Sequence, residues 1–368
     1  IWHDALLFKL FSVVELQHWL FISKWYKSSI ATVQWNNGHS FTFPMRRGMR
    51  QGSVLSPTLF NIFLDELLLR LKDVPCGVRV YDTLFNSVAY ADDVTVFSST
   101  IAGLQQLIDT CYAYSQEYRF KFSQRKTKCL VMGKSLVKMK PTWKLGGTLL
   151  NTESDLEILG VTFNESISYI DHVNKRATSC RRRILGLTTI GMSYPGLSAE
   201  VKSYLWKAVG APTMMYGTDS ISLNTKELNL LKTTQGNIIK RVMGFSKRSH
   251  HSSLLKALRV PPVTDLLSKS TAGLLHRVFR VSSPTRLLQS RALADFIING
   301  RLTKDSLVAR VLRAGHSAVK LLTSPPKIVN HSSQDGISDS LRHLLLHDNH
   351  VKPYSDEHFL ASLLLKCF

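Results

Sequence analysis

The strongest constraint on the fold is a change in residue patterning near residue 166. Before it, short alternating runs typical of strands are interleaved with helical patterns, the first over residues 4–26; after it the patterns are helical. The first part reads helix, β-hairpin, helix, β-hairpin, helix, strand, hairpin, without strict βαβ repetition. This order predicts an α+β fold, with an antiparallel sheet and helices on one face of it over residues 1–165.

The second part divides again. The motif VPPV at 260–263 interrupts the helical patterns, and a stretch rich in Pro, Ser and Gly near 324–340 is typical of a linker. We therefore expect a helical segment over residues 166–260 and a C-terminal helical region over residues 261–368.

Basic residues are concentrated in the second part. Lys and Arg number 47 against 26 Asp and Glu, a formal net charge of +21. Residues 1–165 hold 18 basic and 14 acidic residues, a net charge of +4, whereas residues 166–368 hold 29 and 12, a net charge of +17. Such a surface favours a polyanionic partner, above all nucleic acid. The alternative is a solvated helical surface with surplus basic residues.

Two adjacent aspartates stand in the second predicted hairpin, NSVAYADDVTVFSS. Asp92 and Asp93 lie at its tip, between two apolar runs. A polar turn is one interpretation, because aspartate favours turns. A site for divalent cations is the other, because hard cations prefer oxygen ligands and a bound cation relieves the repulsion between two carboxylates.

A glycine-bearing basic loop precedes this hairpin, in RRGMRQGSVLSP. Gly48 and Gly52 let the backbone approach a ligand, and Gln51 offers an amide to a base or sugar. Ser56 and Pro57 predict a helix start with a capping hydroxyl. Three arginines supply charge for phosphates: Arg46, Arg47 and Arg50. The alternative is a basic loop that only leads into a helix.

Taken together, GMRQGSVLSPTLFNIFLDELL, AYADD, KTKCLVMG and LEILGVTF resemble the reverse transcriptase of non-LTR (LINE-type) retrotransposons. The resemblance covers residues 1–165 closely and the helical region more loosely. MYGTDSISL at 215–223 is similar to a Y-G-x-E-x-W stretch of such elements, with Asp219 where that stretch has Glu. The resemblance implies a right-hand polymerase palm over residues 1–165 and a thumb over residues 166–260.

The resemblance also implies roles for individual residues. Asp92 and Asp93 would be metal ligands for two Mg²⁺ ions, with Mn²⁺ as a substitute, and Lys126 a proton donor to leaving pyrophosphate. Tyr90 and Ala91 would lie beside the primer end, and Leu159 and Gly160 would form the primer-grip turn. The template and nucleotide pocket would be shaped by Gly48, Arg50, Gln51, Gly52, Ser56 and Pro57.

The family uses three carboxylates, and the first precedes a helix like the one that opens this chain. We therefore expect it just upstream of Ile1, and expect that these 368 residues alone do not extend a primer. Asp4 stands in the wrong place to replace it. Two alternatives stay open: a non-catalytic nucleic-acid-binding remnant or co-opted palm and thumb, and a group II intron-type maturase with an RNA-binding region within 261–368.

The basic run KRATSCRRR at 175–183 has two interpretations. It is either a contact to the nucleic-acid backbone or a solvated helix face. The residues concerned are Lys175, Arg176, Arg181, Arg182 and Arg183.

The resemblance and the amino-acid composition together imply the binding partners of the chain and its cellular compartment. The resemblance implies an RNA template, a DNA primer and dNTPs, with the element RNA in a ribonucleoprotein, and neither a membrane nor an obligate protein partner is expected. Nucleus and cytoplasm are the expected locations. Five cysteines without C-x-x-C spacing favour a reducing compartment and argue against a disulfide framework or a cysteine zinc site.

Overall fold

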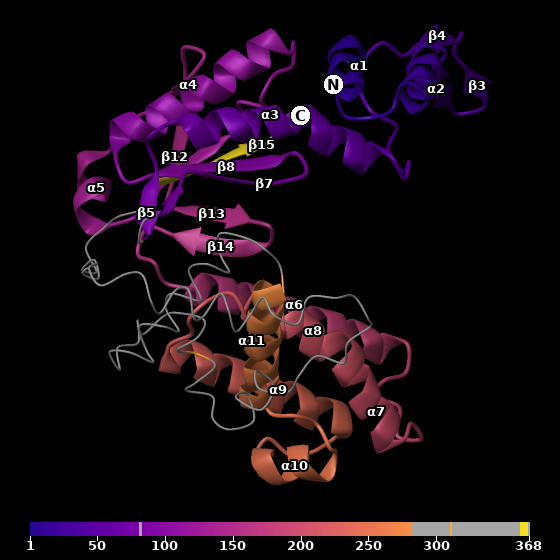
Figure 1. The fold of residues 1–368 in the computed structure, drawn as a ribbon. Helices are drawn as coiled ribbons and strands as arrows, with labels where there is room; N and C mark the ends of the chain where they lie inside the picture. Colours follow the sequence, from indigo (N-terminus) through magenta and orange to yellow (C-terminus); the bar gives the residue numbers. More distant parts are fainter. Residues whose placement is uncertain (81–82, 281–309, 311–360, 367–368) are drawn as a thin grey trace, which may run out of the picture. The chain divides into compact units, whose positions relative to one another are not determined.

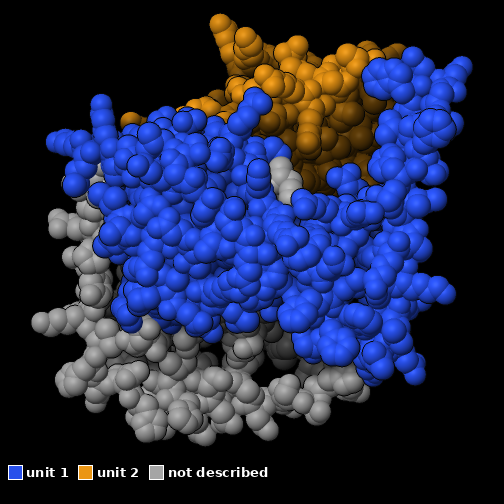
Figure 2. Space-filling model, turned by 90° about the horizontal axis from the view of Figure 1, so that it is seen from above, with its two compact units in different colours: residues 1–156, 164–167, 354–368 blue, residues 157–163, 168–353 orange. Residues whose placement is uncertain are grey.

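The computed structural model describes residues 1–80, 83–280, 310 and 361–366 (Figure 1). The chain forms two compact units, coloured in Figure 2. Unit 1 comprises residues 1–156, 164–167 and 354–368, and unit 2 comprises residues 157–163 and 168–353. The main change of unit therefore falls close to residue 165, and the limits of palm and thumb stay predictions.

Two helices open unit 1, α1 (His3–Phe11) and α2 (Leu16–Lys27). The prediction of one helix over residues 4–26 is wrong, because the chain turns at residues 12–14. The Ser12 hydroxyl donates to the Lys9 carbonyl, competing with the helical pattern at that point. The Trp19 indole then donates to the Leu7 carbonyl at 2.7 Å, which fastens α2 to α1.

A nested pair of short hairpins follows. The outer pair is β1 (Ile30–Ala31) with β4 (Phe43–Pro44), and the inner pair is β2 (Gln34–Trp35) with β3 (Gly38–His39). The predicted turn at NNG is confirmed, since Trp35 pairs with Gly38 and Asn36 takes a φ of 52°.

The main sheet has five strands in the order β12-β9-β15-β8-β7. All neighbours are antiparallel except β12 and β9, which are parallel. The strands are β7 (Ser87–Tyr90), β8 (Asp93–Ser98), β9 (Lys128–Val131), β12 (Asn151–Glu153) and β15 (Ala361–Lys366). The antiparallel prediction is therefore wrong for that one pair.

Helices α3 (Ser56–Asp73) and α4 (Ile101–Glu117) lie on one face of this sheet, as predicted (Figure 1). Fully buried Leu67 and Leu71 of α3 and Leu104 and Leu107 of α4 pack with Val96 of β8 in one core. The periodicity predicted both helices because these positions repeat at helical spacing.

The start of α3 differs from the prediction. The N-cap residue is Leu55, without a capping side chain, and Pro57 lies in the first turn. The Ser56 hydroxyl donates instead to the Arg50 carbonyl at 2.8 Å, so it holds the preceding loop.

Smaller elements complete unit 1. They are the pair β5 (Val78–Val80) and β6 (Thr83–Phe85), helix α5 (Lys134–Met139), and the pair β10 (Lys144–Leu145) and β11 (Thr148–Leu149). The predicted hairpin β13 (Asp155–Ile158) and β14 (Val161–Asn164) stands where the chain leaves this unit.

Apart from residues 157–163, which belong to the β13–β14 hairpin, unit 2 is helical over its described elements. The helices are α6 (Ile170–Thr189), α7 (Ala199–Leu205), the π-helical turn η1 (Trp206–Gly210), α8 (Ala211–Met215), α9 (Thr225–Met243), α10 (His251–Ala257) and α11 (Val263–Arg280). Gly244 ends α9 in the left-handed conformation, as predicted. Val260 and Val263 belong to the same core as α6 and α9, so packing is continuous across residue 260.

The predicted helical C-terminal region does not hold for Ala361–Lys366, which form β15. A short apolar run is compatible with either structure, and here it pairs with β8 on one side and β9 on the other. The predicted linker at 324–340 and residues 281–309 lie outside the described residues. Among the helices that are described, none has the length and apolar character needed to cross a bilayer.

Candidate functional site

The paired aspartates lie at a two-residue turn between β7 and β8. Tyr90 pairs with Asp93, which leaves Ala91 and Asp92 as the turn. Ala91 has a φ of 51°, in the region that non-glycine residues seldom adopt. Tyr90 and Asp92 are exposed and Asp93 is half-buried, while Val94 behind them is fully buried. A strand anchored in the core thus holds two carboxylates at its end.

The glycine-bearing loop is fastened to the first residues of the chain. The Gly48 amide donates to the Ile1 carbonyl at 2.8 Å, and Trp2 and Arg47 form a β-bridge. His3 Nε2 lies 2.9 Å from the Gly48 carbonyl. Gly48 and Gly52 have φ values of 97° and 80°, which explains glycine at both positions.

His3 is a buried member of this anchor. Its ring packs edge-on against Tyr26, with centroids 4.7 Å apart. Burial lowers the pKa of His3, more than the bond to Gly48 raises it. At neutral pH the ring is therefore uncharged, and a protonated Nε2 donates to the Gly48 carbonyl.

The turn and the loop line one cleft in unit 1, with a volume of about 1010 Å³. Gly48 and Gln51 of the loop and Asp92 of the turn are all on its wall. Basic side chains line the same cleft: Arg47, Arg119 and Lys121. A carboxylate, an amide and several cations around one space suit a ligand that carries both phosphate and a metal ion.

The other predicted residues do not line this cleft. Arg50 lines a separate, smaller hollow. Lys126 is exposed in the turn before β9. Six further predicted residues are near cleft-lining residues in sequence, but they do not line the cleft themselves: Gly52, Ser56, Pro57, Tyr90, Ala91 and Asp93.

The predicted primer-grip turn joins β13 and β14. Leu159 and Gly160 both take positive φ, 48° and 79°. The Tyr216 hydroxyl donates to the Leu159 carbonyl at 2.8 Å, and a Cβ on Gly160 would lie 2.9 Å from the Tyr216 ring. The tyrosine of MYGTDSISL is thus a structural partner of this turn, a relation that its distance in sequence concealed.

The basic run on α6 is exposed but largely engaged within unit 2. Lys175 contacts Glu157 at 3.5 Å and Thr162 at 3.1 Å, and the Arg176 guanidinium lies 5.4 Å from the Tyr216 ring centroid. Two of the other arginines donate to threonines on neighbouring helices, namely Arg181 to Thr234 and Arg183 to Thr213.

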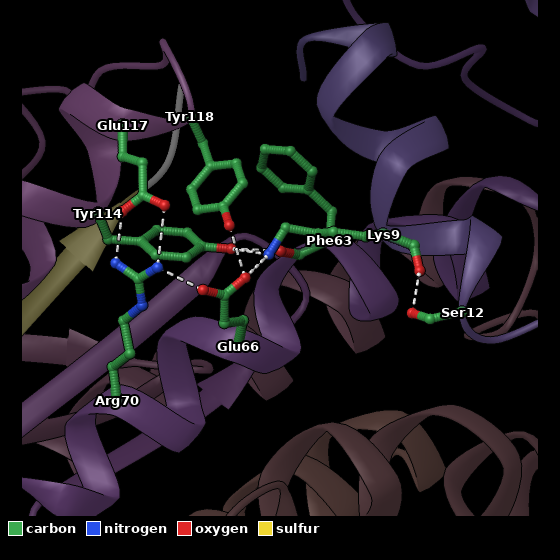
Figure 3. A network of polar contacts seen from close by, with 8 residues as sticks. All are labelled: Lys9, Ser12, Phe63, Glu66, Arg70, Tyr114, Glu117 and Tyr118. Atoms are coloured by element: carbon green, nitrogen blue, oxygen red, sulfur yellow. Dashed lines mark hydrogen bonds and ion pairs between the residues drawn. The ribbon is translucent and has the colours of Figure 1, made fainter.

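A polar network that joins α1, α3 and α4 was not predicted (Figure 3). Lys9 of α1 is 9% exposed, pairs with Glu66 of α3 and donates to the Tyr114 hydroxyl at 3.0 Å. Its ammonium lies 4.0 Å from the ring centroid of Tyr118. Arg70 joins Glu66 to Glu117. The network fastens α1, which carries His3, to α3 and α4.

Electrostatics in this network is dominated by Glu66. Burial raises its pKa, but hydrogen bonds from Lys9, Tyr118 and Arg70 outweigh that effect and lower the pKa to about 2. Burial raises the pKa of Tyr114 and Tyr118, which therefore stay protonated as donors.

The carboxylates predicted as metal ligands lie at the β7–β8 turn. Among the described residues there is no cluster of three or more His, Cys, Asp and Glu with the geometry of a metal site. Asp92 and Asp93 place two carboxylates at the tip of one hairpin, and carboxylate oxygens are ligands that hard divalent cations prefer.

Comparison with known proteins assigns the first part of the chain. Residues 1–163 match the family described as reverse transcriptase (RNA-dependent DNA polymerase). The chain is 22% identical over 288 residues to the RNA-directed DNA polymerase from mobile element jockey of Drosophila melanogaster, covering 76% of this chain and 31% of that protein.

Two further similar proteins are also encoded by mobile elements. The probable RNA-directed DNA polymerase from transposon BS of Drosophila melanogaster is 24% identical over 307 residues, which are 80% of this chain and 33% of that protein. The Pol polyprotein of the type-2 retrotransposable element R2DM from the same species is 31% identical over 134 residues, 36% of this chain and 12% of that protein. The chain spans about a third of the length of the first two relatives. Residues 1–163 therefore carry a reverse transcriptase domain, and the chain is similar to the RNA-directed DNA polymerases of non-LTR (LINE-type) retrotransposons.

Proposed function

We propose that this domain copies RNA into DNA by adding nucleotides to a primer 3′-hydroxyl, with the reaction centred on the cleft at Asp92. The observation that carries the proposal is that one cleft is lined by Asp92 from the hairpin turn and by Gly48 and Gln51 from the glycine-bearing loop. Their separation in sequence is large, so a shared cleft is a tertiary feature and not a consequence of local structure.

Asp92 and Asp93 are the proposed ligands for divalent ions, two Mg²⁺ in the complete enzyme, with Mn²⁺ as a substitute. The carboxyl oxygens of an exposed turn fit such ions, and the rigid core behind Val94 supports them. When bound, these ions lower the charge on the reacting phosphate and activate the attacking hydroxyl.

The remaining cleft residues are proposed to bind the substrate. Arg47, Arg119 and Lys121 neutralise triphosphate or backbone charge, and Gln51 hydrogen-bonds a base or sugar edge. We assign the palm to residues 1–165 and the thumb to residues 166–260, with an RNA template, a DNA primer and dNTPs as partners. The proton-donor role of Lys126 stays a separate prediction, because this side chain is outside the cleft wall.

The proposal is tested first by metal binding to the 368-residue chain. We expect Mn²⁺, followed by electron paramagnetic resonance, to bind the unaltered chain and to bind Asp92→Asn at least tenfold more weakly. Asp73→Asn, which changes an exposed aspartate at the end of α3, should bind as the unaltered chain does. Equal Mn²⁺ affinity in all three proteins would contradict the metal assignment.

Primer extension tests the reaction itself. The assay uses an RNA template, a DNA primer, dNTPs and Mg²⁺ with the longest polypeptide that the gene encodes, and Asp92→Asn should lower extension by at least a hundredfold. Extension that survives this change would refute the proposal. Hybrid binding without any metal-dependent synthesis would favour the alternative, a nucleic-acid-binding remnant.

A further inference from the structure

Two adjoining hollows lie beside the glycine-bearing loop, at the end of α2. The smaller has a volume of about 330 Å³ and includes Trp25, Tyr26, Ser28, Ser29 and Arg50 in its wall. The larger, of about 540 Å³, includes Lys27, Arg46 and Arg47. His3, Tyr26 and Met45 line both, so the hollows are neighbours around these side chains.

Gly48 connects the smaller hollow to the candidate active site. It lines both this hollow and the cleft that contains Asp92. The hydrogen bonds of the Gly48 backbone to Ile1 and His3 fix this shared wall. A ligand in the hollow therefore lies next to the space proposed for the reacting strands.

The charges of the hollows favour an anion. Among the described residues, the wall of the smaller one contains no carboxylate, and Arg50 is its charged residue beside an uncharged His3. Within the described residues, the guanidinium of Arg50 makes no ion pair or hydrogen bond. An uncommitted guanidinium suits one phosphate group. Around the larger hollow three basic side chains, Lys27, Arg46 and Arg47, outnumber the single carboxylate of Asp4, so its net charge suits the phosphates that follow.

The uncharged part of the wall suits a nucleobase. Trp25 is half-buried and packs edge-on against Tyr26, with ring centroids 5.5 Å apart, so aromatic surface meets the hollow. An aromatic surface of this kind can stack on a base of any identity, because every base has a π-face.

Hydroxyl groups of the wall act as acceptors. Ser28 donates its proton to the Lys24 carbonyl at 2.9 Å, and Ser29 to the Trp25 carbonyl at 2.9 Å. Each hydroxyl oxygen keeps its lone pairs, so it can accept from a base amino group or from a ribose 2′-hydroxyl.

We propose that these hollows bind unpaired nucleotides of the RNA template strand, with one base in the smaller hollow and its phosphate on Arg50. The inference rests on the proposed function, because it requires a template strand in the neighbouring cleft. It adds Trp25, Ser28 and Ser29 as residues that recognise single-stranded RNA next to the hybrid.

The experiment compares two ligands by fluorescence anisotropy at one salt concentration. One is a blunt RNA–DNA hybrid, and the other is the same hybrid with an unpaired RNA extension on the template strand. We expect the extension to lower the dissociation constant about tenfold for the unaltered chain. Trp25→Ala should remove most of this gain and leave the blunt hybrid unaffected.

Trp35→Ala is the matched control, because Trp35 is an exposed tryptophan on β2 that lines neither hollow. Should Trp25→Ala fail to fold, Ser28→Ala, at an exposed position, provides the second variant. It should weaken binding of an RNA extension about threefold and weaken binding of a DNA extension less, because DNA lacks the 2′-hydroxyl.

The outcomes separate the two proposals. If the chain binds the blunt hybrid but gains nothing from the extension, or if Trp25→Ala and Trp35→Ala behave alike, the inference is wrong and the proposed function stands. If no hybrid binds, the proposed function itself fails. A DNA extension that binds as tightly as RNA would overturn the assignment of the strand.

Discussion

Glu66 accepts hydrogen bonds from Lys9, Arg70 and Tyr118 and carries the largest pH dependence that we expect of a single residue. Its pKa of about 2 lies below the ordinary value of 4.5. The carboxylate therefore stabilises the folded state fully above pH 4.5, and this stabilisation is lost as the pH falls toward 2. Since its side chain is 36% exposed, solvent screening reduces the effect.

Glu66→Gln should lower the free energy of unfolding by about 2 kcal/mol at pH 7, because Lys9 stays buried without its ion-pair partner. Urea unfolding followed by tryptophan fluorescence measures this. The difference between variant and unaltered chain should shrink as the pH is lowered from 5 to 2. Glu117→Gln is the control; this carboxylate also binds Arg70 but is half-exposed, and we expect a loss of under about 1 kcal/mol. Equal losses in both variants would contradict this account.

Sequence reasoning placed single residues correctly in the fold only where the signal was local. Asp92 and Asp93 were identifiable because turn and strand signals surround them. The partners of Lys9 are 57 and 105 residues away, and no sequence pattern marks a lysine that will be buried. The Leu159–Tyr216 bond is hidden for the same reason, since the two residues are 57 positions apart.

At the scale of elements, helix α6 presents the basic run that periodicity and charge identified. The sequence could not predict which of its arginines make contacts within the protein and which do not. Arg181 and Arg183 donate to threonines of α9 and α8, whereas the Arg182 guanidinium makes no hydrogen bond or ion pair among the described residues. Arg182 is therefore available for a phosphate without loss of an internal contact.

Arg182→Ala should weaken binding of an RNA–DNA hybrid without changing the thermal stability of the chain. The slope of log K against log salt should fall by about 0.9, as expected for one phosphate contact. Arg182→Lys keeps the charge and should keep the slope. Titrations at several salt concentrations measure it, and an unchanged slope in Arg182→Ala would mean that this part of α6 is a solvated surface.

At the scale of the whole molecule, the main sheet of unit 1 depends on the last described residues of the chain. β15 lies between β8 and β9, with Lys366 opposite Asp93 in the register. Hairpins such as β7–β8 and β13–β14 were predicted because their strands are adjacent in sequence. β15 was predicted as helix, because its pairing joins residues more than 200 positions apart and leaves no local signal.

This topology predicts the effect of shortening the chain at residue 360. The two units have separate hydrophobic cores, so calorimetry of the full chain should show two transitions. Removal of residues 361–368 leaves β8 and β9 without the strand between them, and each loses its backbone hydrogen bonds on that side. We expect the midpoint temperature of one transition to fall by several degrees and that of the other to stay unchanged. Glu66→Gln should move the same transition, since Glu66 belongs to unit 1. If truncation moves neither transition, or moves the one that Glu66→Gln leaves unchanged, β15 is not a strand of this sheet.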